Sequence, residues 1–162
     1  MDTSLPAGAG VPPELKLNEL ISWTDHPDDG VRHFSGTAEY STLMDVPGAL
    51  LGEHYRWDLD FGEVREIAEV AVNGTTCRTL WKPPFRTEVT SMLRPGTNRL
   101  SIAVTNLWAN RLAGDSQLPN DQCVSWSTWN PYSSDFKLLP SGLLGPITLR
   151  IGARFSIQWS GS

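Results

Sequence analysis

The chain has 162 residues, with 13 Lys and Arg against 18 Asp and Glu, and a net charge of −5. A chain of this length can form one domain with a sizeable apolar core. Its basic residues are scattered rather than clustered, which argues against a nucleic-acid partner, and no apolar run approaches the ~20 residues that a membrane span requires. The sequence therefore predicts a soluble domain that binds neither nucleic acid nor membrane.

The first residues differ in composition from the remainder of the chain. Residues 1–13 are rich in Pro, Gly and Ala and lack the charged-then-apolar layout of a secretion signal. We interpret them as a linker or disordered N-terminus, with regular structure beginning near Leu15. Residues 14–162 then form a single β-sandwich domain.

Two stretches show the period of two that is typical of half-buried strands. In residues 34–46, apolar and small side chains such as Phe34, Ala38 and Val46 share one face. In residues 55–61, the sequence YRWDLDF alternates strictly between apolar and charged side chains. Each stretch predicts a strand with one face in the core.

Turn signals separate the strands that follow. The run IAEVAVNG ends at Asn73-Gly74, a dipeptide that favours tight hairpins, and Pro95-Gly96 marks a turn between FRTEVT and LSIAVTNLW. The segments 147–151 and 154–159 predict a final hairpin. Apart from one helical turn near Ser91 to Leu93, no segment has helical spacing.

Short strands divided by turns predict an all-β fold, an antiparallel jelly-roll β-sandwich. Residues 109–145 are the exception, because they are polar, contain Pro and Gly, and show no sustained period. Structureless loops longer than about 15 residues are uncommon in compact domains and are often functional. We therefore expect one long loop here.

Trp is unusually frequent, with 7 residues. Trp23, Trp57, Trp108 and Trp159 lie in or at the ends of apolar-periodic strands and are expected in the core. Trp81 precedes two prolines, and core and surface positions remain equally open for it. The aromatic residues expected to reach solvent stand in the long loop, where the alternative is a small core internal to the loop: Trp126, Trp129 and Tyr132.

Polar residues crowd where the predicted strand 100–108 passes into the loop. Arg111 can hold Asp115 through two hydrogen bonds, while Asn106 and Asn110 can satisfy backbone groups at the end of the strand. We interpret this cluster chiefly as the anchor of the loop, with polar ends that line a nearby cleft.

Catalytic chemistry has little support in these residues. Carboxylate pairs such as Asp58 with Asp60 or Glu66 with Glu69 have the spacing of glycosidase acids, but such pairs are common on solvated sheet faces. No GxSxG elbow accompanies the three histidines, which also lack the spacing of a zinc helix. The sequence predicts no catalytic residue.

Two further questions concern metals and thiols. Asp25, Asp28 and Asp29 supply clustered oxygens that suit a structural Ca²⁺, although Asp-Gly loops are usually turns, so we expect no cofactor and keep Ca²⁺ as the less favoured alternative. Cys77 and Cys123 have no CxxC partner; two free, packed thiols are favoured over a disulfide.

Four segments together resemble a known family: GVRHFSGTAEYSTLMDVP, LDFGEVREIAEVAVNG, the run from Leu80 to Asp115, and LLPSGLLGPITL. They are similar to the C-terminal β-sandwich of family 106 α-L-rhamnosidases and, more distantly, to the galactose-binding-like jelly roll of family 2 glycoside hydrolases. The resemblance covers about Leu15 to Leu149. It implies an accessory domain, because hydrolysis in that family belongs to a separate barrel, and an extracellular or periplasmic location.

Three hypotheses follow from the residues and the resemblance together. The first is a non-catalytic carbohydrate-binding module for plant or microbial polysaccharide. The second is a structural domain that packs on a glycosidase catalytic domain without binding sugar, and the third, least favoured, is an independent glycosidase. Flat aromatic surfaces beside polar groups suit sugar rings, so the candidate carbohydrate-binding residues are Trp126, Trp129, Tyr132, Trp81, Asn110, Arg111 and Asp115.

Overall fold

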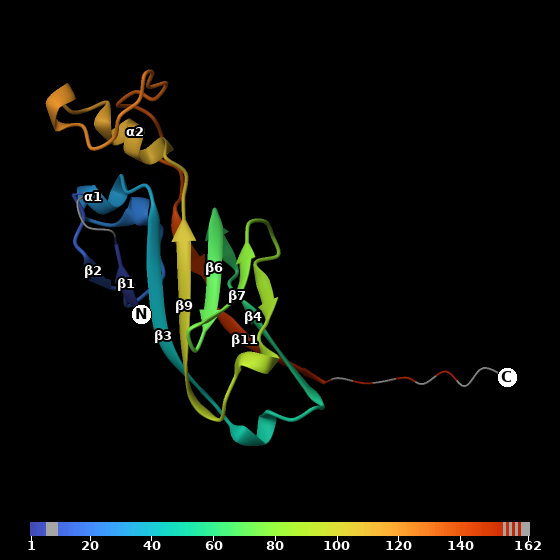
Figure 1. Cartoon of the computed structure of the whole chain (residues 1–162). Helices are drawn as coiled ribbons and strands as arrows, with labels where there is room; N and C mark the ends of the chain where they lie inside the picture. The colour runs from blue at the N-terminus through green and yellow to red at the C-terminus, as the bar shows by residue number, and fades with distance from the viewer. Residues whose placement is uncertain (6–9, 154, 156, 158, 160–162) are drawn as a thin grey trace.

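The computed structural model describes residues 1–5, 10–153, 155, 157 and 159. Its strands form antiparallel ladders in two packed layers (Figure 1). The larger layer is a sheet with the order β2-β1-β3-β9-β6-β7. Its strands are β1 (Asp2–Ser4), β2 (Glu14–Lys16), β3 (Thr37–Val46), β6 (Ile67–Val72), β7 (Thr75–Leu80) and β9 (Gly96–Thr105).

The second layer contains two smaller sheets, with the orders β11-β4-β8 and β10-β5. Their strands are β4 (Tyr55–Asp60), β5 (Glu63–Arg65), β8 (Arg86–Glu88), β10 (Gly142–Gly145) and β11 (Thr148–Ala153). The α-helices are α1 (Asp29–Arg32) and α2 (Ala109–Asp115), and 3-10 turns cover η1 (Trp23–Asp25), η2 (Gly48–Leu50), η3 (Thr90–Met92) and η4 (Asn120–Gln122). None of the helices in the described part of the chain could cross a membrane.

The alternating pattern places the core between the layers. In β4, Trp57 and Leu59 are buried while Arg56 is exposed, and in β3, Ala38 and Tyr40 face inward. Alternate residues of β6 and β9, which belong to the same sheet as β3, are also buried and face the layer that contains β4. The predicted all-β sandwich is therefore confirmed, and its faces follow the predicted alternation.

Two predicted turns have the expected backbone. Asn73 and Gly74 adopt φ of 52° and 81°, as a tight hairpin between β6 and β7 requires, and η3 lies at the single predicted helical turn.

Trp23 and Trp57 are buried as expected. The Trp23 indole donates to the Tyr40 hydroxyl at 2.5 Å, which satisfies a polar group inside the core.

The N-terminal segment departs from the prediction. Residues 2–4 were expected in a linker but form β1, which pairs with both β2 and β3. Leu5, next along the chain, is 6% exposed and belongs to the core cluster. The sheet therefore begins at Asp2 rather than near Leu15, because β3 offers an edge that even a three-residue strand can pair with.

The C-terminal hairpin was predicted from 147–151 and 154–159, and its first strand is β11, paired with β4. Residues 154, 156 and 158 lie outside the described residues. Phe155, Ile157 and Trp159 are in no strand and are exposed. Trp159, expected in the core, is 92% exposed, so that prediction is wrong.

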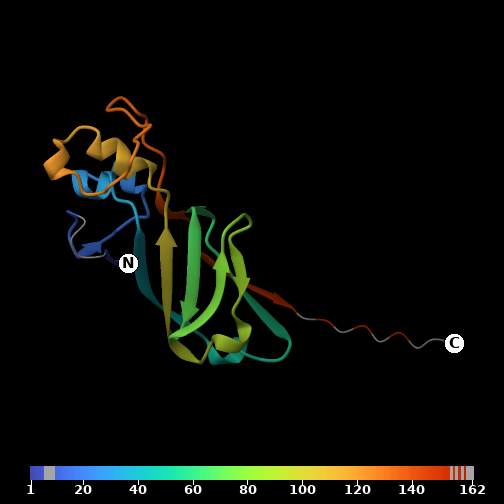
Figure 2. The same ribbon diagram turned by 45° about the horizontal axis from the view of Figure 1, so that its top comes forward.

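The predicted loop at 109–145 is a long excursion at one end of the sandwich, but it is not free of helix. β9 leads directly into α2, and the excursion lies over the end that carries α1 (Figures 1 and 2). A helix of seven residues was not predicted, because it spans too few turns for a periodic pattern to be evident.

Candidate functional site

The excursion begins at a clamp that ends β9. The Asn106 side chain accepts from the Gly36 backbone N–H at 3.0 Å and donates to the Phe34 carbonyl at 2.9 Å. These bonds satisfy backbone groups at the strand end, as the sequence predicted, and they turn the chain away from the sheet. The next residues therefore leave the core.

This turn changes the position of Trp108. Because it continues the alternation of β9, Trp108 was expected in the core, but the strand ends at Thr105 and the Trp108 side chain is 73% exposed. The expectation was wrong, and the indole instead reaches the surface beside the excursion. Asn106 was the signal in the sequence that the alternation ends.

Asn110 anchors the excursion to the sandwich. Its amide nitrogen donates to the Leu139 carbonyl at 2.7 Å and to the Ser141 hydroxyl at 2.9 Å, while its oxygen accepts from the Leu139 N–H. The residue is 1% exposed. Asn110 therefore closes the two ends of the excursion on each other, and its polar atoms are not available to a ligand.

Asp115 plays a similar part at the end of α2. Its carboxylate accepts from the backbone N–H groups of Val124 and Ser125 at 3.1 and 2.8 Å, from the Ser125 hydroxyl, and from Arg111 at 3.0 Å. Burial acts to raise the pKa of this carboxyl, but the bonds from Ser125 and Val124 and the charge of Arg111 hold it below its usual range. Asp115 is thus an ionised anchor of the loop.

A hollow of about 430 Å³ opens between α2 and the second half of the excursion. Of the predicted site residues, the structure brings four to it: Arg111, Trp126, Trp129 and Tyr132. The indoles of Trp126 and Trp129 are 85% and 74% exposed, whereas the Tyr132 ring packs edge-on against Phe136 at 4.6 Å. The remaining lining residues are Ser35, Trp108, Leu112, Ser125, Ser127 and Pro131.

Local bonds hold the aromatic segment in place. Asn130 donates to the Leu112 carbonyl of α2 at 2.7 Å and accepts from the Tyr132 N–H at 3.0 Å. The Ser127 hydroxyl donates to the Trp129 carbonyl at 2.6 Å. These bonds fix the backbone while the indoles stay exposed, so the surface is arranged before any ligand arrives.

Trp81 is not part of this hollow. It follows β7, the edge strand of the larger sheet, where its ring lies 5.0 Å from the Lys82 ammonium, and it is 67% exposed. Of the predicted residues, Trp81, Asn110 and Asp115 do not line this hollow, although Asp115 pairs with Arg111 beside it, and Trp108 joins the four that do.

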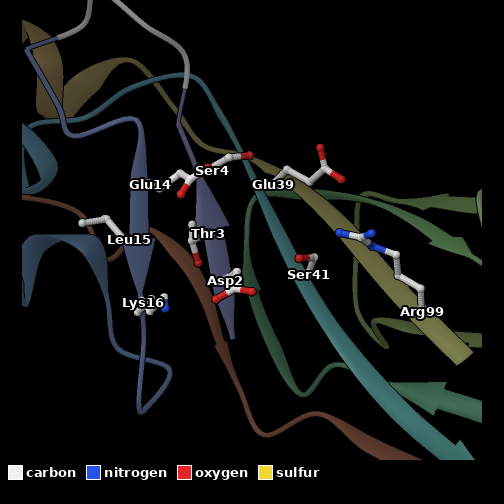
Figure 3. Close-up of a pocket in the computed structure, with 9 residues that line it drawn as sticks. All are labelled: Asp2, Thr3, Ser4, Glu14, Leu15, Lys16, Glu39, Ser41 and Arg99. Carbon is white, nitrogen blue, oxygen red and sulfur yellow. The ribbon is translucent and has the colours of Figure 1, made fainter. Parts of the chain in front are cut away.

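A second hollow, of about 350 Å³, lies on the outer face of the larger sheet (Figure 3). It is lined by polar and aliphatic residues of four strands, including Asp2, Glu39 and Arg99, and none of its lining residues is aromatic. A sugar ring would find no flat apolar surface there. The indole-lined hollow is therefore the candidate site.

One of the two carboxylate pairs considered for hydrolysis, Asp58 with Asp60, is held by arginines. Asp58 pairs with Arg56 at 2.9 Å, and Asp60 pairs with Arg86 and Arg150 at 2.7 and 3.0 Å. The hydrogen bond from Arg86 is the main reason that the pKa of Asp60 lies below its usual range. A carboxyl that stays ionised cannot serve as the general acid of a glycosidase.

Two of the three possible calcium ligands have other partners. The Asp28 carboxylate caps α1 by accepting from the Val31 N–H at 3.0 Å, and Asp29 pairs with Arg32 at 3.0 Å. Within the residues described, no group of three or more His, Cys, Asp or Glu is placed to hold a metal ion. Cys77 and Cys123 are both free thiols, as favoured.

Comparisons with known proteins agree with this fold. Residues 24–136 match the family described as glycosyl hydrolase 2 galactose-binding domain-like. A protein of Formosa agariphila whose name assigns it as a β-glucuronidase is 35% identical over 93% of this chain. The structure of a rhamnosidase from Novosphingobium sp. PP1Y superposes on 93% of this chain with a TM-score of 0.85 and 39% identity.

A β-glucuronidase of Dictyoglomus thermophilum shares the fold at 20% identity over 65% of this chain, with a TM-score of 0.56. The chain spans only 15% of the Formosa protein and 14% of the rhamnosidase. It therefore corresponds to one small part of these large proteins, and the catalytic domain is not within it. The chain belongs to the glycosyl hydrolase 2 galactose-binding-like domain family, as a small, non-catalytic accessory domain.

Proposed function

We propose that this accessory domain binds plant or microbial polysaccharide through the indole-lined hollow. The observation that carries the proposal is the convergence of Trp126, Trp129, Tyr132 and Arg111 on one hollow of about 430 Å³. Indole faces pack against the C–H face of a sugar ring, while the guanidinium supplies directed hydrogen bonds. An open surface of this kind supports dissociation constants of about 1 mM to 1 µM, or roughly −4 to −8 kcal/mol.

Substitution of the exposed indoles tests the proposal. Covering one face of an indole is worth roughly 0.8 to 1.5 kcal/mol, half of what full burial of a large apolar side chain provides, so Trp126→Ala and Trp129→Ala should each weaken binding about four- to twelvefold. The measurement is retardation in gels that contain a panel of polysaccharides, followed by titration calorimetry with oligosaccharides of any that retain the chain.

Trp81→Ala is the matched control, because Trp81 is similarly exposed but lies outside the hollow. It should bind like the unsubstituted chain. Folding of each variant is checked by the near-UV circular dichroism of the buried Trp23 and Trp57. Unchanged retention of the Trp126 and Trp129 variants, or no retention of the original chain on any polysaccharide, would remove the proposal.

The same exposed side chains favour a second candidate function. Leu107, Trp108, Trp126 and Trp129 are between 51% and 85% exposed at one end of the sandwich. Such a surface also suits packing against a glycosidase catalytic domain, and the chain spans only 14% of the rhamnosidase that it resembles. Under this function, the isolated chain self-associates with rising concentration, the two substitutions abolish the association, and sugar titrations are flat.

The proposed ligand also indicates where the domain works. Polysaccharides of plants and microbes are met outside the cell membrane, so we place the domain in the extracellular or periplasmic space. Cell fractionation of a producing strain, with an antibody against the domain, checks this location, and recovery with the cytosol would contradict it.

A further inference from the structure

The hydrogen bonds around the hollow leave it with few free acceptors of high affinity. The hydroxyl groups of Ser35 and Ser127 donate to the carbonyls of Leu107 and Trp129, at 3.1 and 2.6 Å, and the Ser125 hydroxyl donates to Asp115. Their protons are thus already used. What these hydroxyls still offer to a ligand is only a weak neutral acceptor.

The amide and the carboxylate expected to accept bonds from sugar hydroxyls are turned to other partners. Asn110 and Asp115 are 1% and 5% exposed, and their oxygens accept from backbone N–H groups of the excursion. Neither residue lines the hollow, and no carboxylate is among its lining residues. A neutral sugar, which is rich in hydroxyl donors, would find no charged acceptor here.

The lining residues offer more hydrogen-bond donors than strong acceptors. Arg111 is the one charged side chain among the lining residues. Its Nη2 atom lies 3.0 Å from the Asp115 carboxylate, and among the described residues its buried Nε atom has no hydrogen-bond partner. Trp126 and Trp129 are 85% and 74% exposed, and in the described part of the chain their indole N–H groups donate to no protein acceptor, so they are free to donate to a ligand.

The negative charge of Asp115 does not cancel the preference of the hollow for ligands that accept hydrogen bonds. Its carboxylate is compensated by two backbone N–H groups and a hydroxyl as well as by Arg111, and it faces α2 and residues 124–125 rather than the hollow. Arg111 lines the hollow, and because Nη2 pairs with Asp115 and Nε is buried, Nη1 is the guanidinium nitrogen left for a ligand there. A charged acceptor gains more from this single donor than a neutral hydroxyl does, because a hydrogen bond between two charged groups is the stronger kind.

We infer that the hollow selects sugars that carry an oxyanion, either the carboxylate of a uronic acid or a sulfate ester, with Arg111 as the residue that recognises the anion. This inference rests on the proposed sugar-binding function and specifies its ligand class. Since the chain carries a net charge of −5, a polyanion is repelled overall, and its binding requires this local cation. Binding should weaken as salt concentration rises.

The test compares two pairs of oligosaccharides by titration calorimetry at low salt. The first pair is a uronic-acid oligosaccharide and the same compound with its carboxyl groups reduced to alcohols, and the second is a sulfated neutral oligosaccharide and its unsulfated parent. A charge-assisted hydrogen bond should make an anionic form bind about tenfold more tightly than its neutral counterpart. The pair of compounds that shows this ratio identifies whether the recognised anion is a carboxylate or a sulfate ester.

Variants then assign the preference to Arg111. Arg111→Met should reduce the ratio of anionic to neutral affinity to about one, and Arg111→Lys, which retains the pairing charge for Asp115, should keep a reduced preference. Arg99→Met, in the hollow on the sheet face, removes the same charge elsewhere and should leave the ratio unchanged. Indole N–H resonances confirm that each variant is folded, and the Lys variant carries the test if Arg111→Met disturbs the loop.

The outcomes separate the two proposals. Equal binding of anionic and neutral forms overturns this inference and leaves the sugar-binding function in place, as does a preference that persists in folded Arg111→Met. Failure to bind any of the oligosaccharides, charged or neutral, removes the proposed function itself.

Discussion

Asp115 links the ionisation state of one residue to the order of the candidate site. Its side chain is 5% exposed and joins α2 to the backbone of residues 124–125, directly before Trp126. Because these bonds require the ionised carboxylate, its pKa lies below the usual range in the folded chain. The group therefore stabilises the folded loop above the ordinary carboxyl pKa, and this stabilisation is lost as the pH falls through the lowered value.

We expect acid to loosen the loop before it unfolds the sandwich. On lowering the pH below about 4, the ordinary value for an aspartate, the indole N–H resonances of Trp126 and Trp129 should shift while those of the buried Trp23 and Trp57 stay in place. Asp115→Asn should remove this acid-dependent step. The assignment to Asp115 would be contradicted if the resonances of all four indoles moved together. It would also be contradicted if the acid-dependent step persisted in the Asn variant.

Individual side chains also show where sequence patterns lose their predictive value. The alternation in β4 correctly placed Trp57 in the core, because β4 is paired along its length with β11. Trp108 continues the alternation of β9 beyond its last paired residue, Thr105, and Trp159 lies beyond the end of β11; both side chains are exposed. Periodicity predicts burial only while a neighbouring strand holds the backbone, and pairing is a tertiary property.

Helix α2 is held close to the N-terminal part of the chain at Gly114. A Cβ atom added at Gly114 would lie 2.8 and 2.9 Å from the Cγ and Cβ atoms of His33, and 2.6 Å from Nη2 of Arg111. The guanidinium can move aside, but His33 is fixed by its bond to the Asp29 carbonyl at 2.9 Å. The helix would have to move away from α1.

Gly114→Ala should therefore destabilise the site even though alanine favours helices. Overpacking typically costs about 1 to 3 kcal/mol, which exceeds the roughly 1 kcal/mol that alanine gains over glycine inside a helix. The expected result is a lower midpoint of urea unfolding and weaker sugar binding. Ala113→Gly, at the neighbouring position, serves as the control for helix propensity, and an increase in stability of Gly114→Ala would show that the contact is not tight.

Short elements in the excursion explain why the candidate site was only partly predictable. The sequence identified a long aromatic segment and the Arg111–Asp115 pair, both of which the structure contains. It did not identify α2, whose seven residues complete too few turns for a period to emerge. Which indoles share one hollow depends on how α2 folds back, so the separation of Trp81 from Trp126 required coordinates.

The N-terminal strand extends the larger sheet, although composition alone suggested a linker. β1 lies between β2 and β3, so the pairing of β2 with the sheet depends on it. Leu5 is 6% exposed and joins the same core cluster as Trp23. The domain therefore relies on its first residues for part of its stability, whereas a true linker could be altered at no cost.

A pair of leucine substitutions measures this dependence. Leu5→Ala should lower the free energy of unfolding by about 2 to 5 kcal/mol, the usual cost of truncating a buried leucine. Leu43→Ala is the matched control, because Leu43 lies on β3 but is 68% exposed, and its unfolding midpoint in urea should stay near that of the original chain. Equal urea midpoints for the two variants would contradict this prediction. They would show that Leu5 contributes no packing energy and that residues 2–5 behave as a linker.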